Sequence, residues 1–85
     1  MAAYVYVLCS ADARGPITYV GWTNDLDRRL KRHNAGAGAK STRGRAWVLV
    51  YAERHDSRGA ALRREWALKR DRDFRARLRA ATAPV

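Results

Sequence analysis

Arg29 and His33 are the first pair of residues whose types and spacing could do chemistry. They stand four positions apart, so on a helix they would lie on the same face. A planar guanidinium can bind two phosphate oxygens at once, which makes Arg29 a candidate clamp for a phosphate group. The alternative is a solvated, arginine-rich helix on which His33 lies at the boundary of the core.

Tyr6 and Tyr19 each belong to a segment that is typical of a buried strand. If Tyr6 pairs beside Tyr19, both phenols lie on one side of the sheet, close to Gly21. A glycine inside a strand usually marks the close approach of another group, so we expect a phosphate or the Arg29 side chain over Gly21. The alternative is that both tyrosines are ordinary sheet residues with their hydroxyls at the rim.

Glu65 is the acid with the most informative neighbours. On a helix, the residues around it would be mostly apolar, among them Ala61, Leu62 and Leu68. An ionised carboxylate on such a face costs free energy unless it is paired or bound to a metal. One carboxylate can hold Mg²⁺ together with water and phosphate oxygens. The alternative is an ion pair with Arg29, Arg64 or Lys69.

The charge of the chain predicts a polyanionic partner. Its 85 residues include 18 Lys and Arg against 8 Asp and Glu, a formal charge of +10. Nucleic acid is the first candidate, because each neutralised phosphate releases a counterion and so favours binding. The basic residues expected to contact nucleic acid are Lys40, Arg43, Arg45 and Lys69. The alternative for the loop that contains the first three is an ordinary solvated basic loop.

Several classes of protein are excluded by composition. The longest apolar run, which includes the segment 4–9, is far shorter than the roughly 20 residues of a membrane-spanning helix. Cys9 is the one cysteine of the chain, so neither an internal disulfide nor a cysteine-based zinc site can form. The first residues lack the layout of a secretory signal, so we expect a cytoplasmic protein with no membrane role.

The elements that must position these residues follow from periodicity and capping. We expect strands at 3–10, 17–23 and 46–54, and helices at 25–34, 58–70 and after Asp71. Asn24 is the expected cap of the first helix, and Asp56 or Ser57 of the second. Residues 11–16 are expected to form a turn, and 35–44 a loop.

These elements predict an α+β fold in the order β-β-α-β-α-α, with a small three-stranded antiparallel sheet flanked by helices. The length fits one domain over residues 1–81, with a frayed tail at 82–85. Trp47 and Trp66 are expected in the core rather than as platforms for stacked bases.

Three local patterns together resemble a known family. The segments 4–6 (YVY) and 19–21 (YVG) match two short aromatic strand motifs, and Arg29 and His33 follow them. The segment 60–69 (AALRREWALK) resembles a glutamate-bearing helix. In this order, the patterns resemble the GIY-YIG nuclease family, and most closely its small stand-alone bacterial members. The first motif departs from the family because Tyr4 stands where the family has glycine.

The resemblance implies a metal-dependent endonuclease that hydrolyses phosphodiester bonds, with DNA favoured over RNA and with branched DNA or DNA repair as its setting. Glu65 would then hold one Mg²⁺ or Mn²⁺ ion, and Arg29 would neutralise charge on the phosphate. Tyr6 or Tyr19 would orient or deprotonate the attacking water, and His33 would position the phosphate or assist the proton transfer. One alternative is a binding module of the same fold that cuts poorly within a larger complex, and another is a basic structural protein of a ribonucleoprotein. A protein partner or a dimer that supplies specificity stays open.

Overall fold

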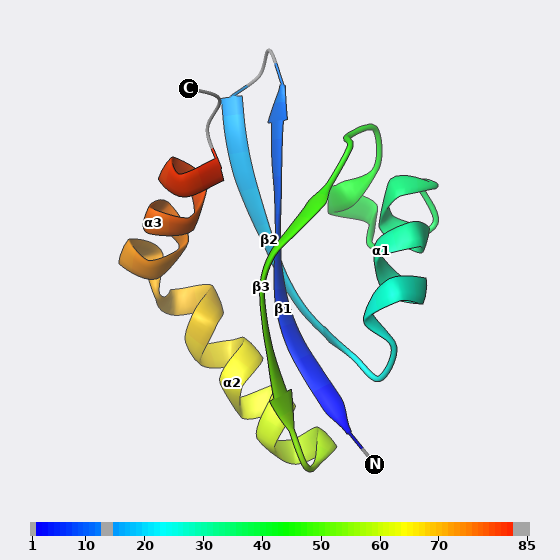
Figure 1. Cartoon of the computed structure of the whole chain (residues 1–85), viewed down its shortest axis with the longest axis vertical. Helices are drawn as coiled ribbons and strands as arrows, with labels where there is room; N and C mark the ends of the chain where they lie inside the picture. Colours follow the sequence, from blue (N-terminus) through cyan, green and yellow to red (C-terminus); the bar gives the residue numbers. More distant parts are fainter. Residues whose placement is uncertain (1, 13–14, 83–85) are drawn as a thin grey trace.

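An antiparallel hairpin of two long strands, β1 (Ala3–Asp12) and β2 (Gly15–Thr23), begins the fold. The computed structural model describes residues 2–12 and 15–82. The other elements are α1 (Leu26–Asn34), a short 3-10 helix η1 (Lys40–Thr42), β3 (Val48–His55), α2 (Arg58–Arg70) and α3 (Arg72–Thr82). Their order confirms the expected β-β-α-β-α-α arrangement, and Figure 1 follows it along the chain.

The sheet has the strand order β2-β1-β3, and both pairings are antiparallel. The central strand β1 is therefore hydrogen-bonded on both edges. Helices cover both of its faces, with α1 on one side and α2 and α3 on the other (Figure 1). The apolar side chains of residues 5–9 are accordingly almost fully buried. This double cover explains why the segment 4–9 is a continuous apolar run rather than an alternating one.

Alternation along β1 divides the core into two clusters. Tyr6 and Leu8 point to the α1 side, where Trp47 joins them and where Tyr19, Leu26 and Leu30 pack against them. Val5 and Val7 point to the other side, toward Ala61 and Leu68 of α2 and toward Phe74 and Leu78 of α3. Phe74 and Leu78 are thus the inward residues of α3.

The predicted boundaries needed two corrections at the first turn and the first helix. The ladder pairs Ala11 with Pro16 and Asp12 with Gly15, so the strands continue through most of the expected turn, and residues 13–14 lie outside the described part. The first helix is capped by Asp25 rather than Asn24, because the Asp25 Oδ1 atom accepts a hydrogen bond from the Arg28 amide at 3.1 Å. The later caps agree with expectation, since Ser57 and Asp71 accept bonds from the amides of Ala60 and Phe74.

The third strand starts later than expected because the main chain of Trp47 is held elsewhere. The Trp47 amide donates to the Asn34 Oδ1 atom at 2.6 Å, and the Asn34 Nδ2 atom donates to the Trp47 carbonyl at 3.1 Å. This clamp ties the end of α1 to the start of β3, so the ladder with β1 begins at Val48. At the other end of the chain, α3 reaches Thr82 and the rest of the expected frayed tail, 83–85, lies outside the described residues.

The prediction for the two tryptophans is right for Trp47 and wrong for Trp66. Trp47 is buried in the α1-side cluster, whereas 61% of Trp66 is exposed. Ala61 and Leu68 are the residues of α2 that face the sheet. At 100° per residue, Trp66 lies on nearly the opposite side of the helix from both of them. None of the helices in the described part of the chain is long and apolar enough to cross a membrane.

Two leucines of α2 provide a matched test of this packing. Leu68 is fully buried, whereas 38% of Leu62 is exposed. We expect Leu68→Ala to lower the free energy of unfolding by about 2–5 kcal/mol, because it removes buried methyl groups and leaves a cavity. Leu62→Ala should cost far less. Urea unfolding followed by circular dichroism measures both, and equal losses would contradict the assigned helix face.

Candidate active site

Tyr6 lies opposite Gly21 in the ladder, and Tyr19 lies opposite Leu8. The expected pairing of Tyr6 with Tyr19 is therefore wrong by two residues. A shift of two keeps the side chains on their face, so the two phenol rings still meet, with centroids 6.3 Å apart.

The space above Gly21 is occupied by Tyr6, not by the phosphate or the Arg29 side chain that the sequence led us to expect there. A Cβ atom on Gly21 would lie 2.6 Å from the Tyr6 hydroxyl oxygen and 3.0 Å from the Tyr19 ring. Real Cβ atoms essentially never come as close as the first of these distances. Gly21 is therefore needed to let the Tyr6 phenol lie across β2 and reach α1.

His33 is fully buried and holds this phenol through a 2.8 Å contact between its Nε2 atom and the Tyr6 hydroxyl. Its Nδ1 atom lies 2.9 Å from the Thr42 hydroxyl oxygen, and Thr42 donates its own proton to the Ala39 carbonyl at 2.8 Å. The Thr42 oxygen can therefore only accept from His33, which places a proton on Nδ1. In the neutral ring, Nε2 is then an acceptor, and the Tyr6 hydroxyl donates to it.

Burial supports this arrangement of protons. Burial raises the pKa of Tyr6 to about 12, although the neighbouring Arg29 acts in the opposite direction. Burial also raises the pKa of Tyr19. The pKa of His33 is lowered by burial and by the charges of Arg29 and Arg32. Near neutral pH, the phenol is thus protonated and the imidazole is uncharged, as the hydrogen bonds require.

Tyr19 forms a wall of this site rather than part of the hydrogen-bonded chain. Its ring centroid lies 4.9 Å from that of His33 and 6.4 Å from that of Trp47. Among the described residues, no side-chain hydrogen bond of its hydroxyl occurs. The sequence could not distinguish the two tyrosines, but their contacts differ. Tyr6 is hydrogen-bonded to the imidazole, whereas Tyr19 packs beside it.

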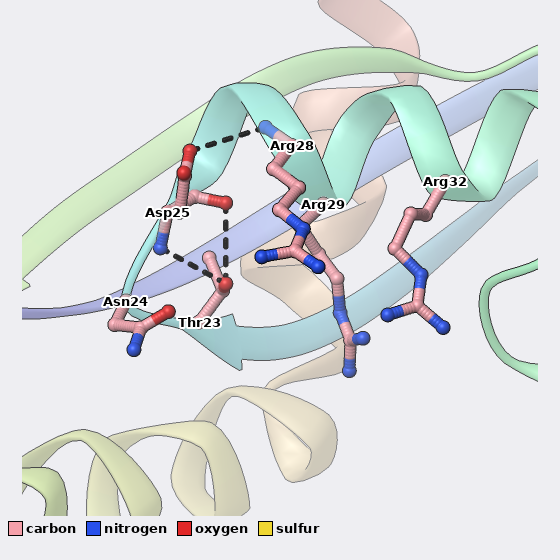
Figure 2. A pocket seen from close by; sticks show the side chains of 6 residues that line it. All are labelled: Thr23, Asn24, Asp25, Arg28, Arg29 and Arg32. Carbon is pink, nitrogen blue, oxygen red and sulfur yellow. Dashed lines mark hydrogen bonds between the residues drawn. The ribbon is translucent and has the colours of Figure 1, made fainter.

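Arg29 borders an open cleft of about 210 Å³ at the start of α1. Figure 2 shows its side chain extending from α1 to the same side as those of Arg28 and Arg32. Arg28 and Arg32 line the same cleft. The Arg29 Nε atom is buried and has no hydrogen-bond partner in the described part of the chain. A buried donor without a partner costs free energy that a bound anionic oxygen would recover.

Glu65 comes from α2, and its side chain is only 19% exposed. Of the predicted ion pairs, the one with Lys69 is present at 3.8 Å. Arg64 instead binds Glu53, with its Nε atom 2.7 Å from the Glu53 Oε1 atom. The negative charge of Glu65 helps to raise the pKa of Tyr6 and that of Tyr19, although α2 covers the other face of the sheet.

The donor set around Glu65 fits a metal ion only in the presence of substrate. No group of three or more His, Cys, Asp or Glu side chains lies together within residues 2–12 and 15–82. The protein thus offers one carboxylate, with a long and weak ion pair to Lys69 that a divalent cation could displace. Mg²⁺ and its chemical relatives accept such a site when water and phosphate oxygens complete the shell.

The four predicted nucleic-acid contacts differ in their surroundings. Lys40, Arg43 and Lys69 are exposed. Arg45 is not available in the same way, because its Nη1 atom donates to the carbonyls of Ser10 and Gly15 at 3.4 and 3.1 Å. The Arg45 side chain braces the β1–β2 hairpin, and its contact with nucleic acid stays a prediction.

Thr42 is the site residue that the sequence did not reveal. It lies in η1, inside the segment that was expected to be a flexible basic loop. The Trp47 Nε1 atom donates to its carbonyl at 2.7 Å, which fixes η1 against the core. Gly38 adds to this fit, since a Cβ atom there would lie 2.4 Å from the His33 Nδ1 atom. Two glycines that follow His33, Gly36 and Gly38, are the sequence signal that could have indicated this close packing of η1 on His33.

The model of the GIY-YIG catalytic domain matches residues 2–77. The chain belongs to the GIY-YIG family. That family consists in general of endonucleases that act on nucleic acid, and the expected fold and family are thereby confirmed.

The relatives and the solved structure found by comparison are UPF0213 proteins. One from Natronomonas pharaonis is 51% identical over 67 residues, which cover 78% of this chain and 75% of that protein. One from Clostridium perfringens is 47% identical over 68 residues, covering 79% and 70%. The solution NMR structure of a UPF0213 protein from Bacillus halodurans is 38% identical, with a TM-score of 0.51 and coverage of 96% of this chain and 86% of that one.

The protonation of His33 can be tested directly by NMR. We expect ¹⁵N shifts of its ring to show a neutral imidazole with the proton on Nδ1 at pH 7.5. Because the folded-state pKa lies below the unfolded value near ~6.5, the unfolded chain takes up the proton first on acidification. The free energy of unfolding should therefore fall as the pH drops below about 6.5. Two results would contradict the deduced chain of hydrogen bonds: a proton on Nε2 at pH 7.5, or a titration midpoint of folded His33 above about 6.5.

Proposed function

We propose that this GIY-YIG protein is a metal-dependent endonuclease that hydrolyses phosphodiester bonds in DNA. One observation supports this most strongly: the Tyr6 hydroxyl is bonded to a neutral, buried His33 beside an Arg29 whose Nε atom has no partner in the described structure. This arrangement supports the roles of a base for Tyr6, of its proton acceptor for His33 and of a phosphate clamp for Arg29. Glu65 adds the carboxylate that the reaction needs.

Tyr6 is the proposed general base. As the oxygen of a water molecule attacks phosphorus, its proton passes to the Tyr6 oxygen while the phenolic proton passes to His33 Nε2. The bond between phosphorus and the leaving oxygen breaks, and the leaving oxygen is protonated from solvent. The transfer to His33 matters because a free phenolate is scarce at neutral pH when the pKa of Tyr6 is about 12. Thr42 keeps Nε2 in the accepting state by holding the proton of Nδ1.

Arg29 is the proposed clamp for the phosphate. Its guanidinium would bind non-bridging oxygens and neutralise the charge that develops on them. Arg28 and Arg32, in the same cleft, extend the positive field along the strand. Glu65 would hold one Mg²⁺ or Mn²⁺, which when bound supplies positive charge to the phosphate and to the leaving oxygen.

Cleavage of plasmid and branched DNA with Mg²⁺ tests this proposal through single substitutions. We expect Tyr6→Phe to lower the rate about a hundredfold to ten-thousandfold, the usual contribution of a positioned base. Glu65→Gln should abolish metal-dependent cleavage, and addition of EDTA to the unchanged protein should do the same. Arg29→Ala should reduce the rate strongly, because the phosphate loses its clamp.

Tyr4→Phe is the matched control for Tyr6→Phe. Tyr4 lies two residues earlier on the same face of β1, and no hydrogen bond of its hydroxyl occurs in the described structure. This variant should cleave like the unchanged protein. Equal losses in both tyrosine variants would contradict the role of Tyr6. Tight, salt-dependent binding without cleavage of any DNA or RNA substrate would overturn the proposal in favour of a binding module.

A further inference from the structure

Trp66 stands on the outside of α2, away from the sheet, and 61% of it is exposed. It borders a shallow groove of about 600 Å³ whose lining is almost entirely apolar: Leu62, Arg63, Trp66 and Ala67. Packing does not require a large aromatic residue there, because Ala61 and Leu68 already make the contacts of α2 with the sheet. The position is thus free to serve a ligand.

The charges around Trp66 select an anionic ligand. The Arg70 guanidinium lies over its ring, 4.0 Å from the centroid. Helix α2 has five basic residues and one acid, which is Glu65 of the proposed active site. An apolar protein partner would not need such a ring of cations, whereas a nucleic-acid strand presents both flat bases and phosphates.

The groove also lies beside the active site. Leu62 and Lys69 are each three or four positions from both Glu65 and Trp66, so they are helix neighbours of both. A strand that leaves Glu65 would therefore meet Lys69, Leu62 and Trp66 within about two turns of helix. The Arg70 guanidinium lies over the ring, and Trp66 nevertheless stays 61% exposed and borders the groove with Leu62, Arg63 and Ala67.

We propose that Trp66 is a stacking platform for an unpaired base of the DNA strand that leaves the active site. The base lies in the groove against the indole ring, while Arg63, Lys69 and Arg70 contact the adjoining phosphates. The preferred substrate is then DNA with unpaired nucleotides beside the cut, rather than continuous duplex. This inference rests on the proposed function in one respect, that a DNA strand passes Glu65.

Binding in EDTA, where no cleavage occurs, tests the platform separately from the nuclease. We expect Trp66→Ala to weaken binding of a single-stranded oligonucleotide roughly tenfold to a hundredfold, as measured by fluorescence anisotropy. Its affinity for a blunt duplex should change less than about twofold. Val48→Ala is the control, since Val48 is an apolar residue of β3 that is likewise about half exposed. It should leave both affinities unchanged.

Tryptophan fluorescence supplies the second readout. Single-stranded DNA should quench the emission of the unchanged protein, and this quenching should vanish in Trp66→Phe, in which Trp22 and Trp47 remain. Unchanged single-strand affinity in Trp66→Ala would overturn the platform. So would a loss of self-association in ultracentrifugation with unchanged DNA binding, because the groove would then bind a second copy.

The two proposals fail in different ways. Trp66-dependent binding of single strands in a protein that cuts nothing would support the platform and overturn the nuclease. Mg²⁺-dependent cleavage that is the same in Trp66→Ala and the unchanged protein on every substrate would support the nuclease and overturn the platform.

Discussion

The hydrogen bond between Tyr6 and His33 is the interaction on which the site depends. It joins the central strand to α1 inside the core, where both groups have lost water. A buried polar pair is tolerated only when each member has a partner. Here the requirement propagates: the imidazole needs Thr42, and Thr42 needs the Ala39 carbonyl. The demand for satisfied hydrogen bonds thus fixes the protonation state that the proposed chemistry uses.

The arginines of the cleft differ from this satisfied network, because the buried Nε atom of Arg29 has no partner in the described residues. Arg28, Arg29 and Arg32 place three positive charges on one side of a short helix, where they repel one another. Arg32, by contrast, donates to the Ala37 carbonyl at 3.3 Å. A fold with so small a core keeps such a cleft only at some cost in stability, and a phosphate would relieve it. Strain of this electrostatic kind marks a ligand site more clearly than the overall charge of +10 does.

The sequence predicted elements better than register. Helix α2 was predicted with the bounds that it has, and its Ser57 cap was one of the two foreseen, because capping and apolar spacing are local signals. The pairing of Tyr6 was displaced by two residues because register depends on where the hairpin turns, and the strands run further than the turn residues indicated. The two tyrosines still came out on one face, since an even shift preserves alternation.

Long-range partners were the least predictable part of the site. Arg29 and His33 could be found by spacing, but Thr42 could not, because η1 has no periodic pattern and its place depends on Trp47. The exposure of Trp66 was missed for a related reason. Residue type alone favours burial of a tryptophan, and the inward face of α2 is defined only once Ala61 and Leu68 meet the sheet.

The amide of Asn34 has a consequence for when the site exists at all. It bonds both the N–H and the carbonyl of Trp47, and it thereby holds together the two ends of the segment between α1 and β3. Thr42 lies within that segment, and His33 immediately precedes Asn34. The bond that fixes the tautomer of His33 therefore belongs to a segment whose two ends Asn34 and Trp47 hold together. A newly made or partly unfolded chain has the same side chains but lacks this hydrogen-bonded arrangement, so the proposed base would exist only in the assembled fold.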